Sequence, residues 1–396
     1  MRIFLAVALL GATLFGAKVV EVDEMYQKSV SCKPCHLKIV QDWENSWHSK
    51  SHYQNDEYFQ ATVDYVKRKT RKSLNSIKIE CATCHNPRVS VTSTSADYEI
   101  RAMMQLNKDS KVDKALEDDA LSEGINCVVC HNIDKIHVNA DQSKRGFNRV
   151  EWTKSGLMSG PFSDAHSPYH KTEARDFMND KADNLCFVCH ANDSSHSGLV
   201  FTNMEKEYKK DGKMCVDCHM GEKKMGVAAT LRIEDGKAKP RMVREHKFQG
   251  GHVESMWKGA LGLEIADNSD NTLITINNPQ PHNIPSGFGS RELILVLTYF
   301  NGDKEINSKS ISFTNHYKSK RGKATIPHLA VEASEESSIP AKGKKVVKVS
   351  KQANATTLKV DLYYRLVNDE VRKILKLEGE QWSKKSLISS KTINLK

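Results

Sequence analysis

The sequence predicts a mainly α-helical, loop-rich region followed by a small β-sandwich-like domain. All ten cysteines lie between Cys32 and Cys218, where they form five copies of one short motif. Patterns of helical periodicity lie between the motifs. After residue 260 cysteine disappears, and runs rich in β-branched and large apolar residues follow. We therefore expect a signal peptide over residues 1–17, a cysteine-bearing domain over residues 18–260 and a β-rich domain over residues 261–396.

The first residues are typical of an export signal. Arg2 precedes an apolar run from Ile3 to Phe15, and Gly16 and Ala17 come before a polar stretch. The run is shorter than the roughly 20 apolar residues of a membrane-spanning helix. It predicts export to the periplasm with cleavage near Ala17, and retention as a short membrane anchor is the alternative.

Each of the five motifs reads Cys-x-x-Cys-His, which is the attachment signature of c-type haem. In a helical turn, residues three and four apart share a face. Two thiols can then bond to one porphyrin while the adjacent imidazole binds its iron. The motifs predict five covalently bound haem c groups, held by Cys32, Cys35 and His36; Cys81, Cys84 and His85; Cys127, Cys130 and His131; Cys186, Cys189 and His190; and Cys215, Cys218 and His219.

Two other uses of paired cysteines fit less well. A structural zinc site takes four ligands and usually combines two pairs, so five pairs leave one over. Disulfides and thioredoxin-like redox motifs do not explain the histidine that follows every pair. Haem attachment accounts for all ten cysteines and for the five histidines.

The stretches between motifs vary in pattern. Residues 56–72 and 98–121 place apolar residues at helical spacing among charges, which predicts helices. Residues 146–164 are rich in Gly, Asn and Ser without periodicity, which predicts a loop.

The β-rich domain is predicted from three runs, 273–276, 292–300 and 358–367. Asn301-Gly302 directly follows the second run and indicates a hairpin turn. A cluster of Lys342, Lys344, Lys345 and Lys348 favours a solvated strand edge over a docking patch.

Eleven of the 16 histidines are left for distal positions after the five motif histidines are assigned. An imidazole in every distal position would make each haem six-coordinate, whereas a haem without one would be open to substrate. The candidates for further iron ligands are His48, His170, His246, His252 and His282. His252 follows paired glycines, which allow the backbone to pass close to a flat cofactor.

The other histidines and the methionines are weaker candidates. His52 is the reserve for His48, and His166 competes with His170. His137 and His196 are less favoured as ligands, and His316 and His328 are expected to have no role at an iron. Methionine is also a possible axial ligand. We expect Met103, Met104 and Met256 in the core, and Met220 on the same side of the iron as His219.

The formal net charge of +10 raises the question of a nucleic-acid or membrane partner. Five haems with two propionates each would bring about ten carboxylates. The basic excess therefore balances the predicted cofactors, and no recognition motif supports nucleic-acid binding.

Several segments also resemble one family of multihaem cytochromes, grouped with the tetrahaem cytochrome that takes electrons from hydroxylamine oxidoreductase. The resemblance covers roughly residues 25–300, and it is carried by Trp43-x-x-Ser46-x-His48, Gly124-Ile125-Asn126, Cys215 to Met220 and His246 to His252. It implies a loop-rich domain with stacked, mostly bis-histidine haems that transfers electrons in the periplasm. The His282 to Gly287 segment resembles the start of a sandwich appended in several such proteins. Five motifs depart from the four of the namesake and the eight of the oxidoreductase, and none carries the lysine typical of the catalytic haem in pentahaem nitrite reductases.

Three functional hypotheses follow. The leading one is a periplasmic carrier of single electrons, whose partners are a membrane quinol-oxidising cytochrome and a periplasmic reductase or oxidase, with peripheral membrane association left open. The second is an oxidoreductase that acts on nitrite, hydroxylamine, sulfite or a similar compound at one open haem, with His166, His196 or Lys171 as candidate acids or cations. The third, an adhesion or scaffold protein built on the β-rich domain, requires that no haem changes redox state.

Overall fold

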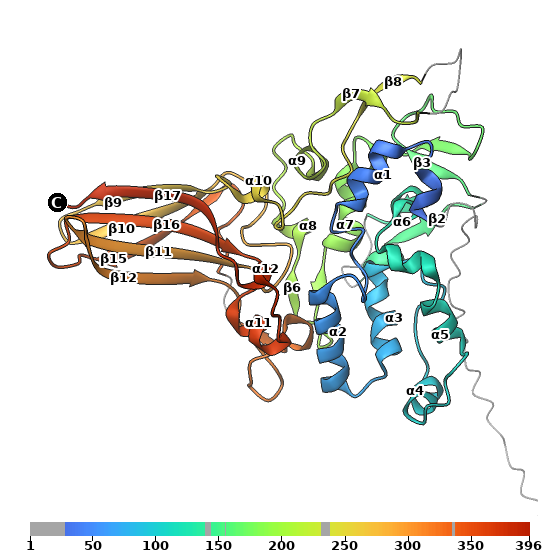
Figure 1. The fold of residues 1–396 in the computed structure, drawn as a ribbon, viewed down its shortest axis with the longest axis horizontal. Coiled ribbons are helices and arrows are strands. Elements are labelled where there is room, and N and C mark those ends of the chain that lie inside the picture. Colours follow the sequence, from blue (N-terminus) through green and yellow to red (C-terminus); the bar gives the residue numbers. More distant parts are fainter. Residues whose placement is uncertain (1–27, 139–143, 155, 231–237, 335–336) are drawn as a thin grey trace, which may run out of the picture.

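The computed structural model describes residues 28–138, 144–154, 156–230, 238–334 and 337–396. The predicted signal peptide lies outside these residues. Figure 1 shows two regions side by side, a region of short helices and loops and a group of long strands that extends away from it. Among the described residues, no helix combines the length and the apolar character needed to cross a membrane.

The first region mixes short helices with small sheets. Its helices are α1 (Leu37–Glu44), α2 (Glu57–Thr70), α3 (Leu74–His85), α4 (Ala96–Met103), α5 (Lys111–Leu116), α6 (Cys127–His131), α7 (Ala182–His190), α8 (Met204–Glu207), α9 (Cys215–His219) and α10 (Glu254–Trp257), with 3₁₀ turns η2 (Ser29–Cys32), η3 (Asp119–Glu123), η4 (Gly146–Arg149) and η5 (Asp176–Met178). Four two-stranded sheets lie among them: β1 (Ile133–Ile136) with β2 (Val150–Trp152), β3 (Met158–Gly160) with β4 (Thr172–Ala174), β5 (Asp193–Ser194) with β6 (Val200–Thr202), and β7 (Lys224–Val227) with β8 (Pro240–Val243).

The predicted helices of this region are only partly continuous. The helix predicted at residues 56–72 is α2, and the Asp56 side chain caps it by accepting a hydrogen bond from the Phe59 amide. The helix predicted at residues 98–121 divides into α4 and α5, because Gln105 and Asp109 between them have positive φ angles that end a helix. The predicted loop at 146–164 is wrong in part, since it holds η4, β2 and β3, which are too short to give a periodic pattern.

The second region consists of two antiparallel sheets with a shared apolar interior. One sheet has the order β15-β10-β9 and the other the order β12-β11-β16-β17. The strands are β9 (Gly262–Asp267), β10 (Asn271–Asn278), β11 (Glu292–Asn301), β12 (Lys304–Phe313), β15 (Gly343–Ser350), β16 (Thr357–Arg365) and β17 (Ser386–Asn394), with a small pair β13 (Tyr317–Lys318) and β14 (Glu332–Ala333).

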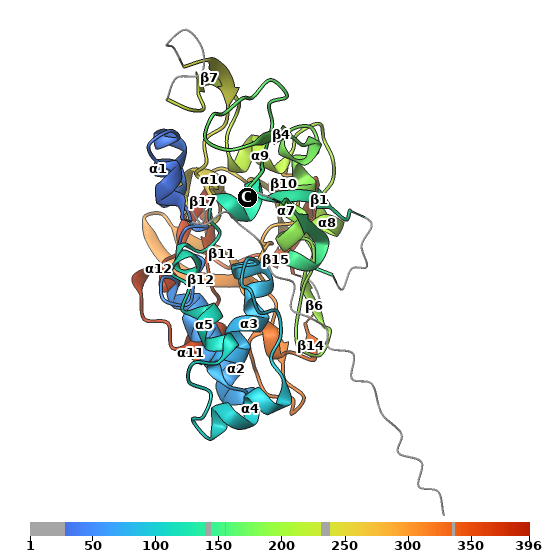
Figure 2. The same ribbon diagram turned by 90° about the vertical axis from the view of Figure 1, so that its right-hand side faces the viewer.

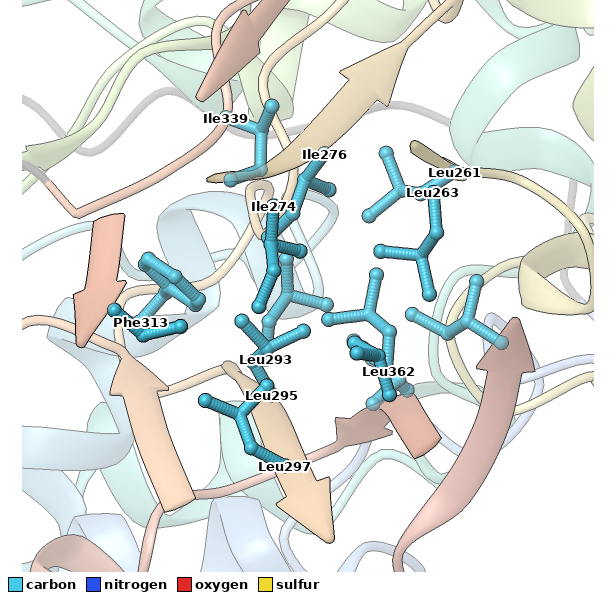
Figure 3. Close-up of a cluster of buried hydrophobic side chains, with 14 of the residues drawn as sticks. Leu261, Leu263, Ile274, Ile276, Leu293, Leu295, Leu297, Phe313, Ile339 and Leu362 are labelled. Carbon is cyan, nitrogen blue, oxygen red and sulfur yellow. The ribbon is translucent and has the colours of Figure 1, made fainter. Parts of the chain in front are cut away.

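Alternation along these strands creates the interior. Buried and partly exposed residues alternate along β10, as expected for a strand with one face on a core. Figure 3 shows Ile274 and Ile276 of β10 near Leu293 and Leu295 of β11 in one cluster of buried side chains. The hairpin between β11 and β12 turns at Gly302, whose φ is 59°, and β15 with Lys344, Lys345 and Lys348 is an edge strand.

The two regions meet in a second apolar cluster. Phe59, Val63 and Val66 of α2 pack with Val371 of α11 (Asp369–Leu375) and with Trp382 of α12 (Glu380–Ser383). The Trp382 indole also donates a hydrogen bond of 2.6 Å to the Glu57 carboxylate. Figures 1 and 2 both show α11 beside α2. The sheets are therefore fixed to the helical region through its second helix.

Candidate functional site

All five Cys-x-x-Cys-His motifs adopt a helical turn. The motifs at 81–85 and 186–190 end α3 and α7, and those at 127–131 and 215–219 form α6 and α9. In the first motif, the amides of Cys35 and His36 both donate to the Cys32 carbonyl. None of the ten cysteines is in a disulfide. Each motif thus presents two free thiols and an imidazole from one turn.

Four of the five motif histidines face a second imidazole. The distances between ring centres are 6.4 Å for His36 and His170, 6.4 Å for His190 and His48, 6.3 Å for His131 and His246, and 6.3 Å for His219 and His282. The angles between the ring planes lie between 19° and 35°. The partners in each pair come from distant parts of the chain, and His282 comes from the turn that follows β10.

The separation of these pairs fits a metal ion held between them. A metal–imidazole bond is about 2 Å long and the nitrogen lies about 1.1 Å from the ring centre, so two imidazoles on opposite sides of one metal ion have centres roughly 6.3 Å apart. Rings in direct contact would lie closer, as the 3.7 Å between Trp47 and His252 illustrates. The four pairs are therefore spaced for a shared metal atom rather than for stacking on each other.

Hydrogen bonds at one ring nitrogen orient several of these histidines so that the other nitrogen can bind a metal. The Nδ1 atoms of His36, His131 and His219 lie 2.7, 2.7 and 2.5 Å from the carbonyl oxygens of Ala228, Ser159 and Gln249. Among the facing histidines, Nδ1 of His282 lies 2.9 Å from the Asn283 carbonyl oxygen. When Nδ1 donates to a carbonyl, Nε2 is left with its lone pair for a metal.

Burial keeps two of the facing histidines uncharged. It lowers the pKa of His48 to about 3 and that of His246 to about 4. A neutral imidazole is the form that binds iron. The Nδ1 atom of His48 is buried without a hydrogen-bond partner, a cost that a metal bond or a cofactor contact would offset. These donor sets fit haem c.

His85 is the exception among the motif histidines. Among the described residues its ring contact is with Phe59, and no histidine ring pairs with it at the spacing of the other four. Its Nδ1 atom lies 2.8 Å from the Ser51 hydroxyl, and the Phe59 ring stacks on its face at 4.1 Å and 7°. Burial lowers the pKa of His85 to about 4, with the charge of His328 acting in the same direction. The candidates thus provide four facing imidazoles for five motifs.

His252, the fifth distal candidate, does not face a motif histidine. Its ring stacks on Trp47 and meets Trp382 at its edge. Burial is the main cause that lowers the pKa of His252 to about 3. The neighbouring Gly251 is needed for a close approach to protein, since a Cβ there would lie 2.3 Å from the Tyr364 hydroxyl.

The remaining histidines lie apart from the facing pairs. His137 and His196 contact the carboxylates of Glu151 and Glu80, and His316 contacts Glu370. His166 lies on the exposed side of the loop that carries His170, and His52 accepts from a backbone amide two residues on. His328, expected to have no role, instead lies close enough to His85 to influence its charge.

Contacts between thiols show which motifs are neighbours. The Cys32 side chain lies close to that of Cys127, the Cys84 side chain to that of Cys189, and the Cys186 side chain to that of Cys215. Charge on Cys186 also acts on Cys130. The motifs therefore lie in the order first, third and fourth, with the second and fifth both next to the fourth.

Comparison with known proteins agrees with this geometry. Residues 31–132 match the model of the family described as cytochrome c554 and c-prime. The chain is a multihaem c-type cytochrome. Its fold is similar to that of a penta-heme cytochrome c552 from Thermochromatium tepidum, with a TM-score of 0.67 and 18% identity over 93% of this chain and 98% of that chain. No curated protein sequence matches the cytochrome.

Proposed function

We propose that this cytochrome carries single electrons in the periplasm through five haem c groups, one at each motif. The observation that carries the proposal is the set of four facing imidazole pairs, because two imidazole ligands fill both axial positions and leave no room for substrate. Haem iron supplies the one-electron chemistry when bound. The chain supplies the thiols, the axial ligands and a fixed spacing between centres.

The proposed axial ligands follow the observed pairs. They are His36 with His170, His131 with His246, His190 with His48, and His219 with His282. His282 ties the β-rich region to the fifth motif, which gives that region a direct part in completing a redox centre. His252 has no place in this ligand set.

The order of the motifs supports a branched path. From the first motif it runs through the third to the fourth, where it divides toward the second and the fifth. Adjacent motifs whose thiols touch would hold their porphyrins in close contact, which is what rapid electron transfer requires. The first, second and fifth motifs are the three ends of this path.

An exposed apolar patch beside the first motif supports docking of a partner there. The carbonyl of Ala228, next to β7, holds His36, and the β7–β8 hairpin exposes Met225 by 68%, Met242 by 46% and Val227 by 39%. Apolar patches of this kind are typical of protein interaction sites. We assign the patch to a redox partner, either a membrane quinol-oxidising cytochrome or a periplasmic reductase or oxidase.

Low-temperature EPR of the oxidised protein, with spins counted per chain, tests the ligand set. We expect at least four low-spin ferric haems, checked by magnetic circular dichroism because coupled haems can hide intensity. Fewer than four would contradict the proposal. Attachment of five haems is tested separately by the mass of the intact protein.

Docking is tested by the rate at which quinol-reduced membranes of the source organism reduce the cytochrome. M225D combined with M242D should slow reduction at least fivefold, because two charges would be buried in the interface. The matched control is S308D on exposed β12, far from the patch (Figure 1). Equal reduction rates for the double variant and for S308D would mean that the partner does not dock at the patch.

A further inference from the structure

Arg291 of the β-rich region carries a charge that no acidic side chain of the described residues balances. It directly precedes β11, and its guanidinium donates a hydrogen bond of 2.6 Å to the Ser286 carbonyl oxygen. In the part of the chain that the structure describes, no carboxylate forms an ion pair with it. A guanidinium has five N–H donors in a planar fork. Arg291 therefore has a charge and several donors left for an acceptor outside the protein chain.

A second unsatisfied donor lies beside Arg291. Tyr364 of β16 is 6% exposed, and its hydroxyl is buried without a hydrogen-bond partner. Burial raises the pKa of Tyr364, while the charge of Arg291 acts against this rise, and the phenol keeps its proton. A buried hydroxyl without a partner is costly. The charged and the neutral donor therefore both call for one acceptor at the same place.

Two glycines allow both side chains to come close to the backbone around them. A Cβ at Gly251 would lie 2.3 Å from the Tyr364 hydroxyl and 3.4 Å from Cζ of Arg291. Gly287 has a φ of +74°, and a Cβ there would lie 3.3 Å from Nη1 of Arg291. A larger residue at Gly251 would therefore displace the hydroxyl. The two donors are held together between the segments that carry these glycines.

The same two segments hold the imidazoles of the fifth motif. Before the first glycine, the Gln249 carbonyl oxygen lies 2.5 Å from Nδ1 of His219. Before the second glycine, His282 faces His219 with ring centres 6.3 Å apart. Burial lowers the pKa of His282, and the charges of His219 and Arg291 act in the same direction. A haem at the fifth motif would therefore have both donors beside it.

We propose that Arg291 and the Tyr364 hydroxyl bind a propionate carboxylate of the haem attached at the fifth motif, and that Arg291 thereby raises the reduction potential of this haem. A carboxylate accepts paired hydrogen bonds from a guanidinium and takes a further one from the phenol. Reduction adds an electron to the haem, so a fixed positive charge beside it favours the ferrous form. This inference rests on the haem attachment at the fifth motif that the proposed function includes.

A redox titration of the holoprotein at pH 8, followed by EPR and optical spectra, measures the potentials of the haems. R291Q should shift the ferric–ferrous equilibrium of one haem about tenfold toward ferric, which lowers its potential by about 59 mV. Y364F should shift the same haem in the same direction by about threefold, because it removes one hydrogen bond from the carboxylate. R291K keeps the charge and should have a smaller effect than R291Q. The matched control is R321Q, which removes a charge from an exposed turn of the same region and should leave every potential unchanged.

The haem that shifts must be the one whose low-spin EPR signal disappears in H282A. If R291Q shifts no haem, or shifts the haem of the fourth motif, on whose His190 the charge of Arg291 also acts, the proposal is wrong. If R291Q shifts the fifth haem but Y364F does not, Arg291 acts as a charge at a distance and the carboxylate site is absent. If R291Q does not fold, an unchanged potential in Y364F is enough to overturn the proposal. Fewer than four low-spin haems in the wild type would instead contradict the proposed carrier function.

Discussion

Residues 262–394 and residues 28–260 bury their apolar side chains in different ways. In the β-rich region one cluster between two sheets includes the fully buried Leu293, Leu295 and Leu297. In the helical region the buried apolar residues form separate clusters, for example around Ile79 and around Ile133. The same region holds all ten motif cysteines and all the facing imidazoles except His282. The comparison indicates that the sheets have a core of protein, whereas the motif-bearing region depends on attached haem for much of its interior.

Removing haem should produce the largest difference between the regions. We expect protein made without haem attachment to lose protection from hydrogen exchange throughout residues 28–260, because buried neutral imidazoles and thiols would lack the cofactor that surrounds them. Amides of β10, β11 and β16 should stay protected. Hydrogen exchange read by mass spectrometry checks this, with the holoprotein as control. If the α7 amides were equally protected from hydrogen exchange with and without haem, the motif-bearing region would not depend on haem for its interior.

A cavity in the sheet core should destabilise the β-rich region and leave the motif-bearing region largely unchanged. L295A removes a side chain that is 0% exposed, and we expect it to destabilise the β-rich region by about 2–5 kcal/mol. S308A on exposed β12 should change stability by less than about 0.5 kcal/mol. Denaturant unfolding followed by hydrogen exchange of the β10 and β11 amides and by haem absorbance separates the regions. If both signals shift together, the cluster of Phe59, Val371 and Trp382 couples them into one unit.

Sequence patterns predicted much of this architecture but not its pairings. Runs of β-favouring residues located β10, β11 and β16. The facing partner of each motif histidine lies far away in the sequence, so no local pattern identifies it. The paired glycines before His252 allow a close approach, since a Cβ at Gly251 would meet the Tyr364 hydroxyl. Nothing local distinguished His328, whose position depends on how the β-rich region packs.

Replacing His282 tests whether the β-rich region supplies an iron ligand at the fifth motif. H282A should convert about one low-spin haem per chain to high-spin, because His219 would lose the imidazole 6.3 Å away. The other haems should be unchanged, and the sheets should keep their stability. EPR spin counting measures the effect, and H316A in the same region is the control. Unchanged spin counts would mean that His282 is not an iron ligand.

The smallest expected effect concerns pH. The pKa of His252 is about 3 in the folded protein against an ordinary value of 6.5, mainly because the ring is buried on Trp47. A depressed pKa means that unfolding takes up a proton below pH 6.5, so this contribution to stability is present above that pH and is lost as pH falls toward 3. Between about pH 5.5 and 4, replacing His252 with glutamine should reduce the pH dependence of the unfolding free energy by at most about 1.4 kcal/mol per pH unit. H137Q, which removes a half-exposed histidine beside Glu151, should leave the slope near that of the wild type. Because Trp47 and Trp382 lie in the contact between the two regions, a flatter slope in H252Q alone would show that this contact contributes to the loss of stability in acid.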